Sequence, residues 1–534
     1  MGTGRAALYA MSLVMLVLSF PVFDLWPLAY LCLVPWLLAV EDSALGPAAF
    51  CSWLLGLAFF GIEVAWLRFV TIPGWFSLVV FLSLYYLAFG AAVRALRSRW
   101  RVGFIWIVPI CWVALEYVRS FVLGGFSWYY LGHSQYQNLA TIQVADLAGV
   151  YGISFVLCMA NGAIADVVLG WRSAQALKEK LVKVAPSVLV TGLAVAGMWG
   201  YGTFRLRQYE PIVGPKISTI QGSIPQSIKN DPGSAQDVLG QYLRLSEGAV
   251  HQGAAMLVWP ETMVPGFLNL ALEDRWHINI QELNDAARQG MEALKDLAQR
   301  ARMRLLVGGQ SLGIVREKKD GDAAVTRFNS AYYIDARYLE EQRQFLGRYD
   351  KIELVPFGEY TPLKKYFPFL AKMVPYEVGF SPGREVNIFD LNGAKFGVLI
   401  CYEDTIPRLV RRFRANGAQF LVNISNDGWF EGSSELDEHL AICAFRAVEN
   451  RVGIVRSVNT GISAFISPTG RIEDVVKDKN GRRKQIEGVL TRNVRLDRRE
   501  TLYTRYGDWL GRGCLAFMVF LVVFGGVRGP RTKR

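Results

Sequence analysis

Long apolar stretches are the feature that most restricts how this chain of 534 residues can fold. They lie near residues 6–22, 25–40, 46–67, 75–93, 103–122, 143–169, 186–204 and 509–527. A helix needs about 20 consecutive apolar residues to cross the hydrocarbon core of a bilayer. Hydrophobic residues make up 52% of the chain and charged residues only 19%, which is too apolar for a soluble enzyme of this size. The sequence therefore predicts a multi-pass α-helical membrane bundle of about eight spans.

The basic residues beside these stretches predict the orientation of the bundle. Arg94–Arg101 and Arg172–Lys183 are rich in arginine and lysine, and such loops stay on the cytoplasmic side. The seventh span then leads residues 205–505 to the opposite side of the membrane, and the eighth returns the basic tail Arg528–Arg534 to the cytoplasm. Because this placement accounts for much of the net charge of +12, nucleic acid is not an expected partner.

Residues 205–505 have a different pattern, in which short β-branched runs alternate with amphipathic stretches. The expected strands are Ile217–Ile220, Met256–Val258, Leu305–Val307, Ala331–Ile334, Phe396–Ile400, Phe420–Ile424 and Val452–Val458, and the clearest helices are Asn284–Ala301 and Glu438–Arg451. Such alternation is typical of an α/β layered domain. The predicted organisation is therefore seven transmembrane helices in residues 1–204, a soluble domain in 205–505, and an eighth transmembrane helix with a basic tail in 506–534.

One cysteine stands out among the seven in the chain. Five lie inside apolar runs, where a thiol acts as a small hydrophobic side chain, and Cys443 lies on an expected helix, where packing is the simpler role. Cys401 follows an apolar strand and precedes Thr405–Phe413, which has helical periodicity. Backbone N–H groups at a helix start hold an oxyanion and favour the thiolate, so Cys401 is the candidate nucleophile. The spacing of cysteines and histidines predicts no metal site.

Two other segments carry charged residues that suit the chemistry of a cysteine nucleophile. Glu261 follows an expected strand, and a glutamate there can accept the proton of a thiol. Lys351 can neutralise the negative charge that develops during attack on a carbonyl. Each residue alone also has a plainer explanation, since a thiol in an apolar strand is often core packing and a lone lysine is often a solvated surface charge.

Together these segments resemble the nitrilase, or carbon–nitrogen hydrolase, superfamily, whose catalytic set is Glu-Lys-Cys. The matching segments are Trp259–Glu261, Arg348–Lys351, Val355–Tyr360, Gly397–Asp404, Gln221–Gln226, Asn423–Phe430 and Asn459–Ser463. With apolar spans on both sides, nearly the whole chain resembles the bacterial apolipoprotein N-acyltransferase family. One position departs from the family pattern, because Asn230 follows Lys229 where an aromatic residue is expected.

The resemblance implies an αββα sandwich on the periplasmic side of the bacterial inner membrane. It also implies a two-step reaction through a thioester on Cys401. A fatty acyl chain would leave a membrane phospholipid in the first step. In the second, it would reach the N-terminal α-amine of a diacylglyceryl-cysteine on an apolipoprotein.

The resemblance also assigns roles to residues around the nucleophile and implies no cofactor. Glu261 would be the general base, and Lys351 would stabilise the tetrahedral intermediate. Glu359 and Glu403 would orient that pair, and Tyr402 would help to form the oxyanion site.

Two other functions stay open at the level of sequence. The first is a membrane-tethered amidase that uses the same three residues to hydrolyse a carbon–nitrogen bond. The second is a transporter or receptor with a degenerate domain of this kind, although the spans lack the paired interrupted helices typical of transporters.

The segment Tyr360–Phe380 follows the expected Lys351 region and mixes aromatic residues, prolines and lysines. Aromatic rings and ammonium groups suit the headgroup level of a membrane, so we expect an apolar lid between the site and the bilayer. A loop that packs on the domain core is the alternative.

Overall fold

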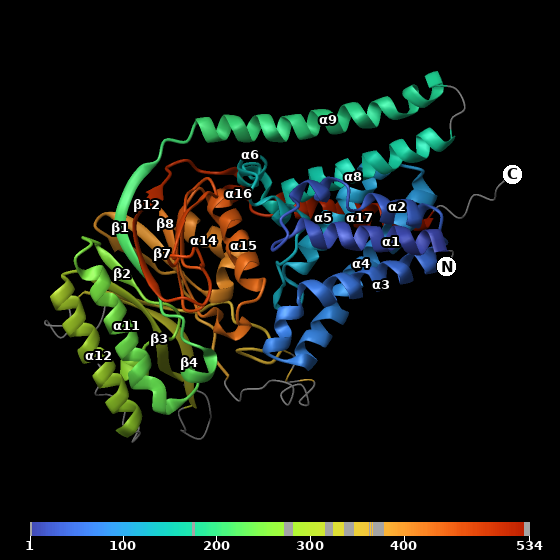
Figure 1. The fold of residues 1–534 in the computed structure, drawn as a ribbon. Coiled ribbons are helices and arrows are strands. Elements are labelled where there is room, and N and C mark those ends of the chain that lie inside the picture. The colour runs from blue at the N-terminus through green and yellow to red at the C-terminus, as the bar shows by residue number, and fades with distance from the viewer. Residues whose placement is uncertain are drawn as a thin grey trace. The chain divides into compact units, whose positions relative to one another are not determined.

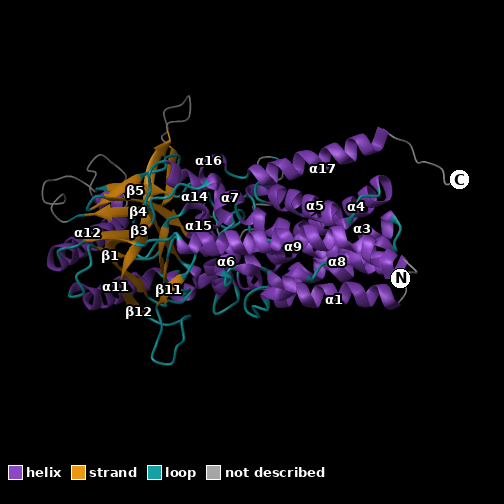
Figure 2. Ribbon diagram, turned by 90° about the horizontal axis from the view of Figure 1, so that it is seen from above, coloured by secondary structure: helices purple, strands orange, loops and turns teal. Residues whose placement is uncertain are grey.

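The computed structural model describes residues 3–173, 177–271, 281–315, 324–335, 346–362, 364, 366 and 379–527. The chain divides into two compact units (Figure 1). One unit is helical and comprises Met1–Tyr209 and Thr501–Arg534, whereas the other, Glu210–Glu500, contains the β-sheets. Figure 2 distinguishes the two by their helices and strands.

The helical unit is built largely from apolar helices. They include α1 (Thr3–Ser19), η1 (Trp26–Tyr30), α2 (Val34–Glu41), α3 (Leu45–Glu63), α4 (Ile72–Trp100), α5 (Phe104–Arg119), α7 (Ala145–Ala148), α8 (Val150–Ser173), α9 (Leu177–Arg207), α16 (Leu502–Tyr506) and α17 (Trp509–Val527). By length and composition, four segments among the described residues can cross a membrane: Leu45–Glu63, Ile72–Trp100, Val150–Ser173 and Val184–Arg207. Shorter apolar helices occupy Thr3–Ser19, Trp26–Glu41, Leu139–Ala148 and Trp509–Gly525. The expected number of about eight spans stays a prediction.

Two of the expected spans are not single helices. The stretch 25–40 forms η1 and α2, with Pro27 and Pro35 in their first turns. Proline lacks a backbone N–H and is therefore accommodated at the start of a helix rather than inside it. The stretch 143–169 forms α7 and α8, separated by Gly149 at a φ of 67°. A residue with positive φ ends a helix.

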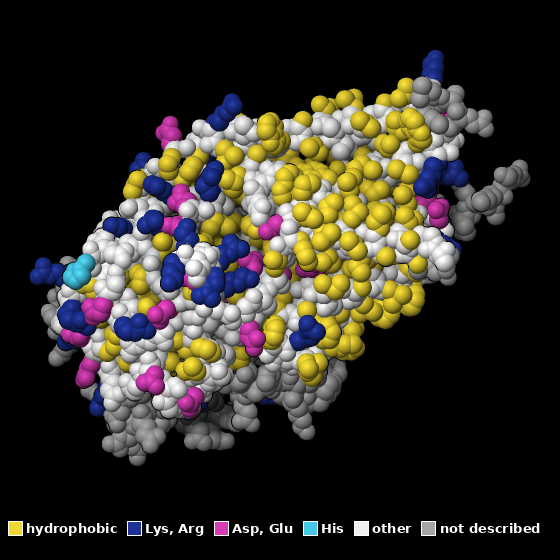
Figure 3. Space-filling model, in the orientation of Figure 1, with side chains coloured by type: hydrophobic (Ala, Val, Ile, Leu, Met, Phe, Trp, Pro, Cys, Tyr) yellow, Lys and Arg dark blue, Asp and Glu magenta, His cyan; other side chains and the backbone are white. Residues whose placement is uncertain are grey.

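The surface of the helical unit is strongly apolar. Leu189 and Leu193 on α9, and Phe520 and Phe524 on α17, are exposed. Figure 3 shows hydrophobic side chains gathered over one face of this unit. Soluble proteins rarely expose such extended apolar surface, whereas the hydrocarbon of a bilayer favours it.

Two buried carboxylates in the helical unit have close partners. Asp146 accepts hydrogen bonds from the Arg205 guanidinium at 2.8 Å and from the Tyr201 hydroxyl at 2.7 Å. Glu116 accepts hydrogen bonds from the Trp112 indole and from the backbone N–H of Leu131, both at 2.7 Å. Because a charge in a membrane is costly without a partner, these contacts explain how both residues are tolerated.

The second unit contains two six-stranded sheets. In the first the strand order is β12 (Gly488–Leu496), β1 (Ile212–Gln221), β2 (Met256–Val258), β3 (Arg304–Val315), β4 (Ala324–Ile334) and β5 (Gly347–Asp350). In the second it is β11 (Ile472–Val475), β10 (Ala464–Ile466), β9 (Gly453–Val458), β8 (Phe420–Ser425), β7 (Ala394–Ile400) and β6 (Ile388–Leu391). Strands β1, β2 and β3 are parallel to one another, as are β7, β8 and β9.

Helices cover the outer faces of both sheets, so the layers run helix, sheet, sheet, helix (Figure 1). Helices α11 (Ala235–Val250) and α12 (Gln281–Ala301) pack on the first sheet, where Tyr242 and Leu257 share one hydrophobic core. Helices α14 (Pro407–Ala415) and α15 (Glu435–Asn450) flank the second. The two sheets are tied together by the Ser457 hydroxyl, which lies 3.0 Å from the carbonyl oxygens of both Ile220 and Val258.

The expected strands are confirmed, since each lies within an observed strand apart from Val452, which directly precedes β9. The expected helices fall within α12 and α15, α15 ending one residue before Arg451. Strands β2, β7 and β8 are parallel strands of their sheets, and residues that follow such strands commonly form binding sites. Glu261, Cys401 and Asn426 occupy those positions.

Candidate active site

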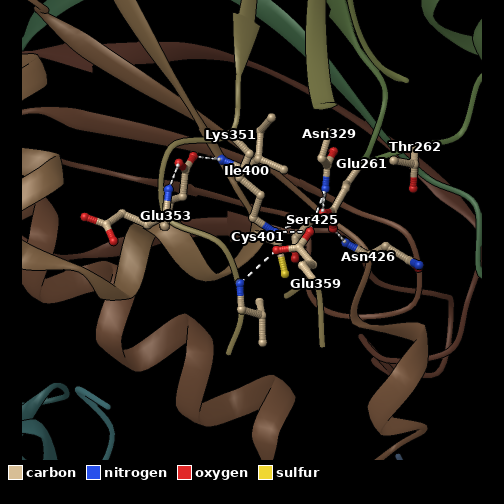
Figure 4. Close-up of polar contacts among 12 residues, drawn as sticks. Glu261, Thr262, Asn329, Lys351, Glu353, Glu359, Ile400, Cys401, Ser425 and Asn426 are labelled. Atoms are coloured by element: carbon tan, nitrogen blue, oxygen red, sulfur yellow. Dashed lines mark hydrogen bonds and ion pairs between the residues drawn. The ribbon is translucent and has the colours of Figure 1, made fainter. Parts of the chain in front are cut away.

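The three expected catalytic residues come from both sheets and lie together. Glu261 follows β2, Lys351 directly follows β5, and Cys401 directly follows β7. Figure 4 shows the side chains of Glu261, Lys351 and Glu359 directed toward one another beside the sulfur of Cys401. We call these four residues the nucleophile cluster.

Lys351 is the positive centre of the nucleophile cluster. Its Nζ lies 3.0 Å from Glu359 Oε1 and 3.3 Å from Glu261 Oε1, and its side chain is only 1% exposed. Burial works to lower the pKa of Lys351, but the carboxylates of Glu359 and Glu261 outweigh burial and hold that pKa well above its usual value. Lys351 therefore stays charged at neutral pH.

Both oxygens of Glu261 are held by donors that the sequence analysis did not find. The Asn329 amide donates to Glu261 Oε1 at 2.6 Å and to Glu359 Oε1 at 3.1 Å. The backbone N–H of Asn426 donates to Glu261 Oε2 at 3.0 Å. A sequence signal for Asn329 exists, because asparagine is depleted in strand interiors and Asn329 lies inside β4.

Cys401 adopts an uncommon backbone conformation at the end of β7. Its φ is 52°, in the left-handed region that costs a residue with a Cβ about 1 kcal/mol or more. The residue begins a short 3₁₀ turn, Cys401–Thr405, and α14 begins only at Pro407. Strain of this kind is common at functional sites, where the surrounding fold holds the residue in place.

The Cys401 thiol is protonated in this resting arrangement. Burial raises its pKa above the usual value, the Glu261 carboxylate adds to that rise, and Lys351 opposes it. Burial and the Glu261 carboxylate thus oppose the thiolate that a helix start would favour. Cys401 begins a 3₁₀ turn, and the nine-residue helix α14 begins six positions further along the chain, at Pro407. Attack by Cys401 requires a base, and Glu261 is the adjacent carboxylate.

Glu403 connects the ends of two strands rather than contacting Lys351. Its Oε2 accepts a hydrogen bond from the backbone N–H of Ile400 at 2.8 Å. Its Oε1 accepts from the backbone N–H groups of Ile352 and Glu353 and from the Tyr349 hydroxyl, at 2.7, 3.1 and 2.8 Å. Burial nevertheless raises the pKa of Glu403 to about 7. Glu403 thus links the segment that carries Cys401 to the one that carries Lys351.

Of the other two supporting residues, Glu359 lies in the cluster itself. Its second oxygen accepts from the backbone N–H of Val355 at 2.9 Å, so the loop after Lys351 closes on that lysine. Tyr402 is 7% exposed, and its carbonyl accepts from the Thr405 hydroxyl at 2.7 Å. The backbone N–H of Tyr402 lies next to the nucleophile in sequence, where an oxyanion donor is expected.

One glycine makes the position of Glu261 possible. A Cβ on Gly308 of β3 would lie 2.4 Å from the Pro260 carbonyl oxygen and 2.6 Å from the Glu261 Cα. Real Cβ atoms do not approach other heavy atoms so closely. Gly308 therefore lets the chain that carries Glu261 pass directly against β3.

A second group of buried charges lies in the same unit, and we call it the sealed cluster. Its members are Asp404, Asp427, Glu435, His439 and Arg456, each at most 1% exposed. Asp404 lies 2.6 Å from both His439 Nε2 and Arg456 Nη1. The other side of His439, Nδ1, lies 3.4 Å from Glu435 Oε1 and 3.7 Å from Asp427 Oδ1.

The sealed cluster was not found from the sequence, which indicated only an amphipathic helix there. A signal was present, because three acidic residues and His439 occur within five positions of the first turns of α15. Asp427, Glu435 and His439 also have a geometry in which ligand atoms lie within 4.8 Å of one another. However, Arg456 Nη2 lies 3.6 Å from Asp427 Oδ2, so a guanidinium already supplies the positive charge that a metal ion would bring.

The predicted lid over Tyr360–Phe380 falls largely on residues 363, 365 and 367–378, which lie outside the described residues. Phe380 is described, and its backbone N–H donates to the carbonyl oxygen of Glu359 at 3.1 Å. The lid therefore stays a prediction.

Comparisons with known proteins match both units. Residues 12–163 match the model of the apolipoprotein N-acyltransferase N-terminal domain, and residues 216–501 match that of carbon-nitrogen hydrolase. Among solved structures, an amidase from Nesterenkonia is 20% identical and covers 56% of this chain and 97% of its own, with a TM-score of 0.37. An apolipoprotein N-acyltransferase of Geobacter metallireducens is 34% identical over 94% of this chain and 92% of its own length. One from Chlorobaculum tepidum is 28% identical, over 96% of this chain and 94% of its own.

Proposed function

Because this chain belongs to the apolipoprotein N-acyltransferase family, we propose that it transfers a fatty acyl chain from a membrane phospholipid to an apolipoprotein. The acceptor is the N-terminal α-amine of a diacylglyceryl-cysteine, and the intermediate is a thioester on Cys401. The observation that carries this proposal is the contact of one buried lysine with two carboxylates beside a cysteine, at 3.0 and 3.3 Å. The names of the relatives indicate an apolipoprotein as the acceptor of the acyl chain.

In the first step, the Cys401 sulfur attacks the ester carbonyl of the phospholipid while Glu261 accepts the thiol proton. Lys351 and backbone N–H groups after Cys401 stabilise the negative charge on the tetrahedral intermediate. The intermediate collapses with cleavage of the ester C–O bond. Glu261 returns its proton to the departing oxygen, so a lysophospholipid leaves and an acyl thioester remains.

In the second step, the α-amine of the acceptor attacks the thioester carbonyl and loses a proton to Glu261. The C–S bond breaks as the amide forms, and the proton on Glu261 passes to the departing Cys401 sulfur. A thioester retains enough acyl-transfer potential to acylate an amine. Water is the competing acceptor, so the apolar surroundings of a membrane site favour transfer over hydrolysis.

The proposal includes eight membrane spans, with residues 205–505 on the periplasmic side of the inner membrane. The apolar helices and the basic segments Arg94–Arg101 and Arg172–Lys183 support this orientation. Engineered cysteines at exposed positions of residues 205–505 should react with a membrane-impermeant maleimide in intact spheroplasts. Engineered cysteines in the two basic segments should react only after permeabilisation, and the reverse pattern would refute the orientation.

Intact-mass analysis of protein purified from membranes tests the reaction. The wild-type protein should carry an adduct with the mass of a fatty acyl group, and hydroxylamine should release it because it is a thioester. Cys401→Ala should lack the adduct, whereas Cys443→Ala, which removes the buried thiol of the same unit, should retain it. If a small amide is hydrolysed and no lipid adduct forms, the protein is a membrane-tethered amidase instead.

A further inference from the structure

The short helix α10 (Gln226–Lys229) and the residue after it reach Glu261 through two separate sets of contacts. In the first, Lys229 Nζ donates to the carbonyl oxygen of Glu261 at 3.3 Å and to the Thr262 hydroxyl. Thr262 has a φ of 53°, so the chain turns sharply directly after the proposed base. Burial lowers the pKa of Lys229 to about 8, although the Glu261 carboxylate opposes that change.

The second set of contacts is a chain of side-chain amides. Gln226 Nε2 donates to Asn230 Oδ1 at 2.7 Å, and Gln226 Oε1 accepts from Asn426 Nδ2 at 2.8 Å. Asn426 Oδ1 in turn accepts from Asn459 Nδ2 at 2.9 Å. Each amide has one donor end and one acceptor end, so the acceptor at Asn230 determines which end of Gln226 faces Asn426.

The amide chain ends on the proposed base. The backbone N–H of Asn426 donates to Glu261 Oε2 at 3.0 Å, and the side chain of Asn426 is bound by both Gln226 and Asn459. Figure 4 shows Asn426 and Thr262 beside Glu261. The orientation of one peptide N–H toward the carboxylate therefore depends on side chains that themselves never touch Glu261.

We propose that Gln226, Lys229 and Asn230 are positioning residues for Glu261. Lys229 holds the backbone of Glu261, and the chain from Asn230 through Gln226 to Asn426 holds its Oε2 oxygen. An aromatic residue at position 230, as the family pattern leads one to expect, has no side-chain amide oxygen to accept from Gln226. The amide of Asn230 thus gives this chain a polar connection from the exposed end of α10 to the base. This inference relies on the proposed function only for the role of Glu261 as the base.

The test compares Asn230→Leu, Asn230→Asp and Gln226→Leu in the full-length membrane protein. The first readout is the rate of Cys401 alkylation by iodoacetamide between pH 6 and pH 10, measured by peptide mass without any lipid substrate. The second is acyl loading from phospholipid, resolved into kcat and KM. Gln236→Leu is the matched control, because Gln236 is an exposed residue of α11 and pairs with the surface residue Gln289.

Loss of one amide contact should slow alkylation and kcat by about three- to tenfold, with KM unchanged. Asn230→Leu and Gln226→Leu should both show this loss. The alkylation profile should also move to higher pH, because a Glu261 carboxylate with a weaker donor at Oε2 stays protonated to higher pH and cannot then accept the thiol proton. Asn230→Asp keeps the acceptor oxygen and should stay within about twofold of wild type. Lys229→Met should lower kcat in the same way.

Three results would overturn the inference. In the first, Asn230→Leu and Gln226→Leu behave like the control Gln236→Leu in both readouts. In the second, Asn230→Asp is as slow as Asn230→Leu. In the third, the variants change KM alone. The last result would assign α10 to substrate binding. Failure of the proposed function is distinguishable, because a protein that never loads an acyl group would still show the altered alkylation profiles.

Discussion

The nucleophile cluster and the sealed cluster are both groups of buried charges in one unit, yet they differ in access and in charge balance. In the nucleophile cluster, Glu359 retains 14% exposure and Cys401 is partly accessible. In the sealed cluster, Arg456 and Asp404 are fully buried. The nucleophile cluster is thus partly accessible and includes the thiol of Cys401, whereas the five residues of the sealed cluster are closed to solvent.

The two clusters also differ in how their charges are balanced. One lysine serves two carboxylates in the nucleophile cluster, and a protonated thiol lies beside them, so a proton can move during a reaction. In the sealed cluster Asp404 holds the pKa of His439 well above its usual value, against the effect of burial, and Arg456 adds a permanent charge. Buried charge alone therefore does not identify an active site. An active site also needs access for a substrate and a reactive atom. The sealed cluster connects Asp404, near Cys401, with Asp427, near Asn426.

The largest effect is expected from Glu261→Gln, which should separate chemistry from stability in the nucleophile cluster. Glutamine cannot accept the thiol proton, so acyl loading should fall by about 10²- to 10⁴-fold. Lys351 keeps Glu359 as a partner, so the melting temperature should change little. Stopped-time intact-mass measurements give the loading rate, and Glu247→Gln, a half-exposed surface glutamate, is the control. Loading above a tenth of the wild-type rate would remove Glu261 as the base.

Arg456→Met, in the sealed cluster, should have the opposite effect: it should lower the stability of the protein. Removal of one partner from a buried ion network leaves uncompensated carboxylates and costs about 3–5 kcal/mol. The melting temperature in detergent should therefore fall by about 10 °C. Arg482→Met, which removes an exposed ion pair with Asp478, should leave it unchanged. An unchanged melting temperature in Arg456→Met would mean that the sealed cluster contributes nothing to stability.

Substitutions of Asn329 should change the rate of acyl loading by a smaller factor, and they test how its hydrogen bonds organise the nucleophile cluster. Asn329→Ala removes the shared donor of Glu261 and Glu359 and should slow acyl loading by about tenfold. Asn329→Asp places a third carboxylate beside these two and should slow loading further, because like charges favour protonation of the base. Ser311→Ala, which alters a buried hydroxyl elsewhere between β3 and β4, serves as the comparison. Equal rates for the two Asn329 variants would show that charge at this position does not matter.

The smallest effect is a dependence of stability on pH through Glu435. Burial, with the neighbouring Asp427 carboxylate, raises the pKa of Glu435 to about 7. A carboxyl group with a raised pKa in the folded state binds its proton more tightly there than in the unfolded chain, where its pKa is about 4.3. Its contribution to stability is therefore complete below about pH 4.3 and is lost as the pH rises through about 7. The melting temperature should therefore fall by a few degrees between pH 6 and pH 8. Glu435→Gln should remove this fall of the melting temperature with pH. An unaltered slope between about pH 6 and pH 8 would mean that another group titrates there.

Part of this molecule could be predicted from local patterns alone. The strands that end before Glu261 and Cys401 have β-branched periodicity, and the helices of the membrane unit have long apolar runs. The three proposed catalytic residues are found because each lies in a short segment typical of one family. The apolar runs predicted helix boundaries less reliably where a proline or a glycine interrupts the run, as Pro35 and Gly149 do.

What the sequence by itself determined is seven of the strands and the helices α12 and α15, because periodicity is a local property. Family motifs in the sequence also single out Glu261, Lys351 and Cys401 as the proposed catalytic residues. Only the tertiary structure decided that Asn329 and the Asn426 N–H hold the base. Those contacts join residues about 70 and 165 positions apart in the chain. It also decided that the Cys401 thiol is protonated, since burial and the charges of Glu261 and Lys351 act through space. Distances between distant segments and the loss of water around a group arise only when the layers pack.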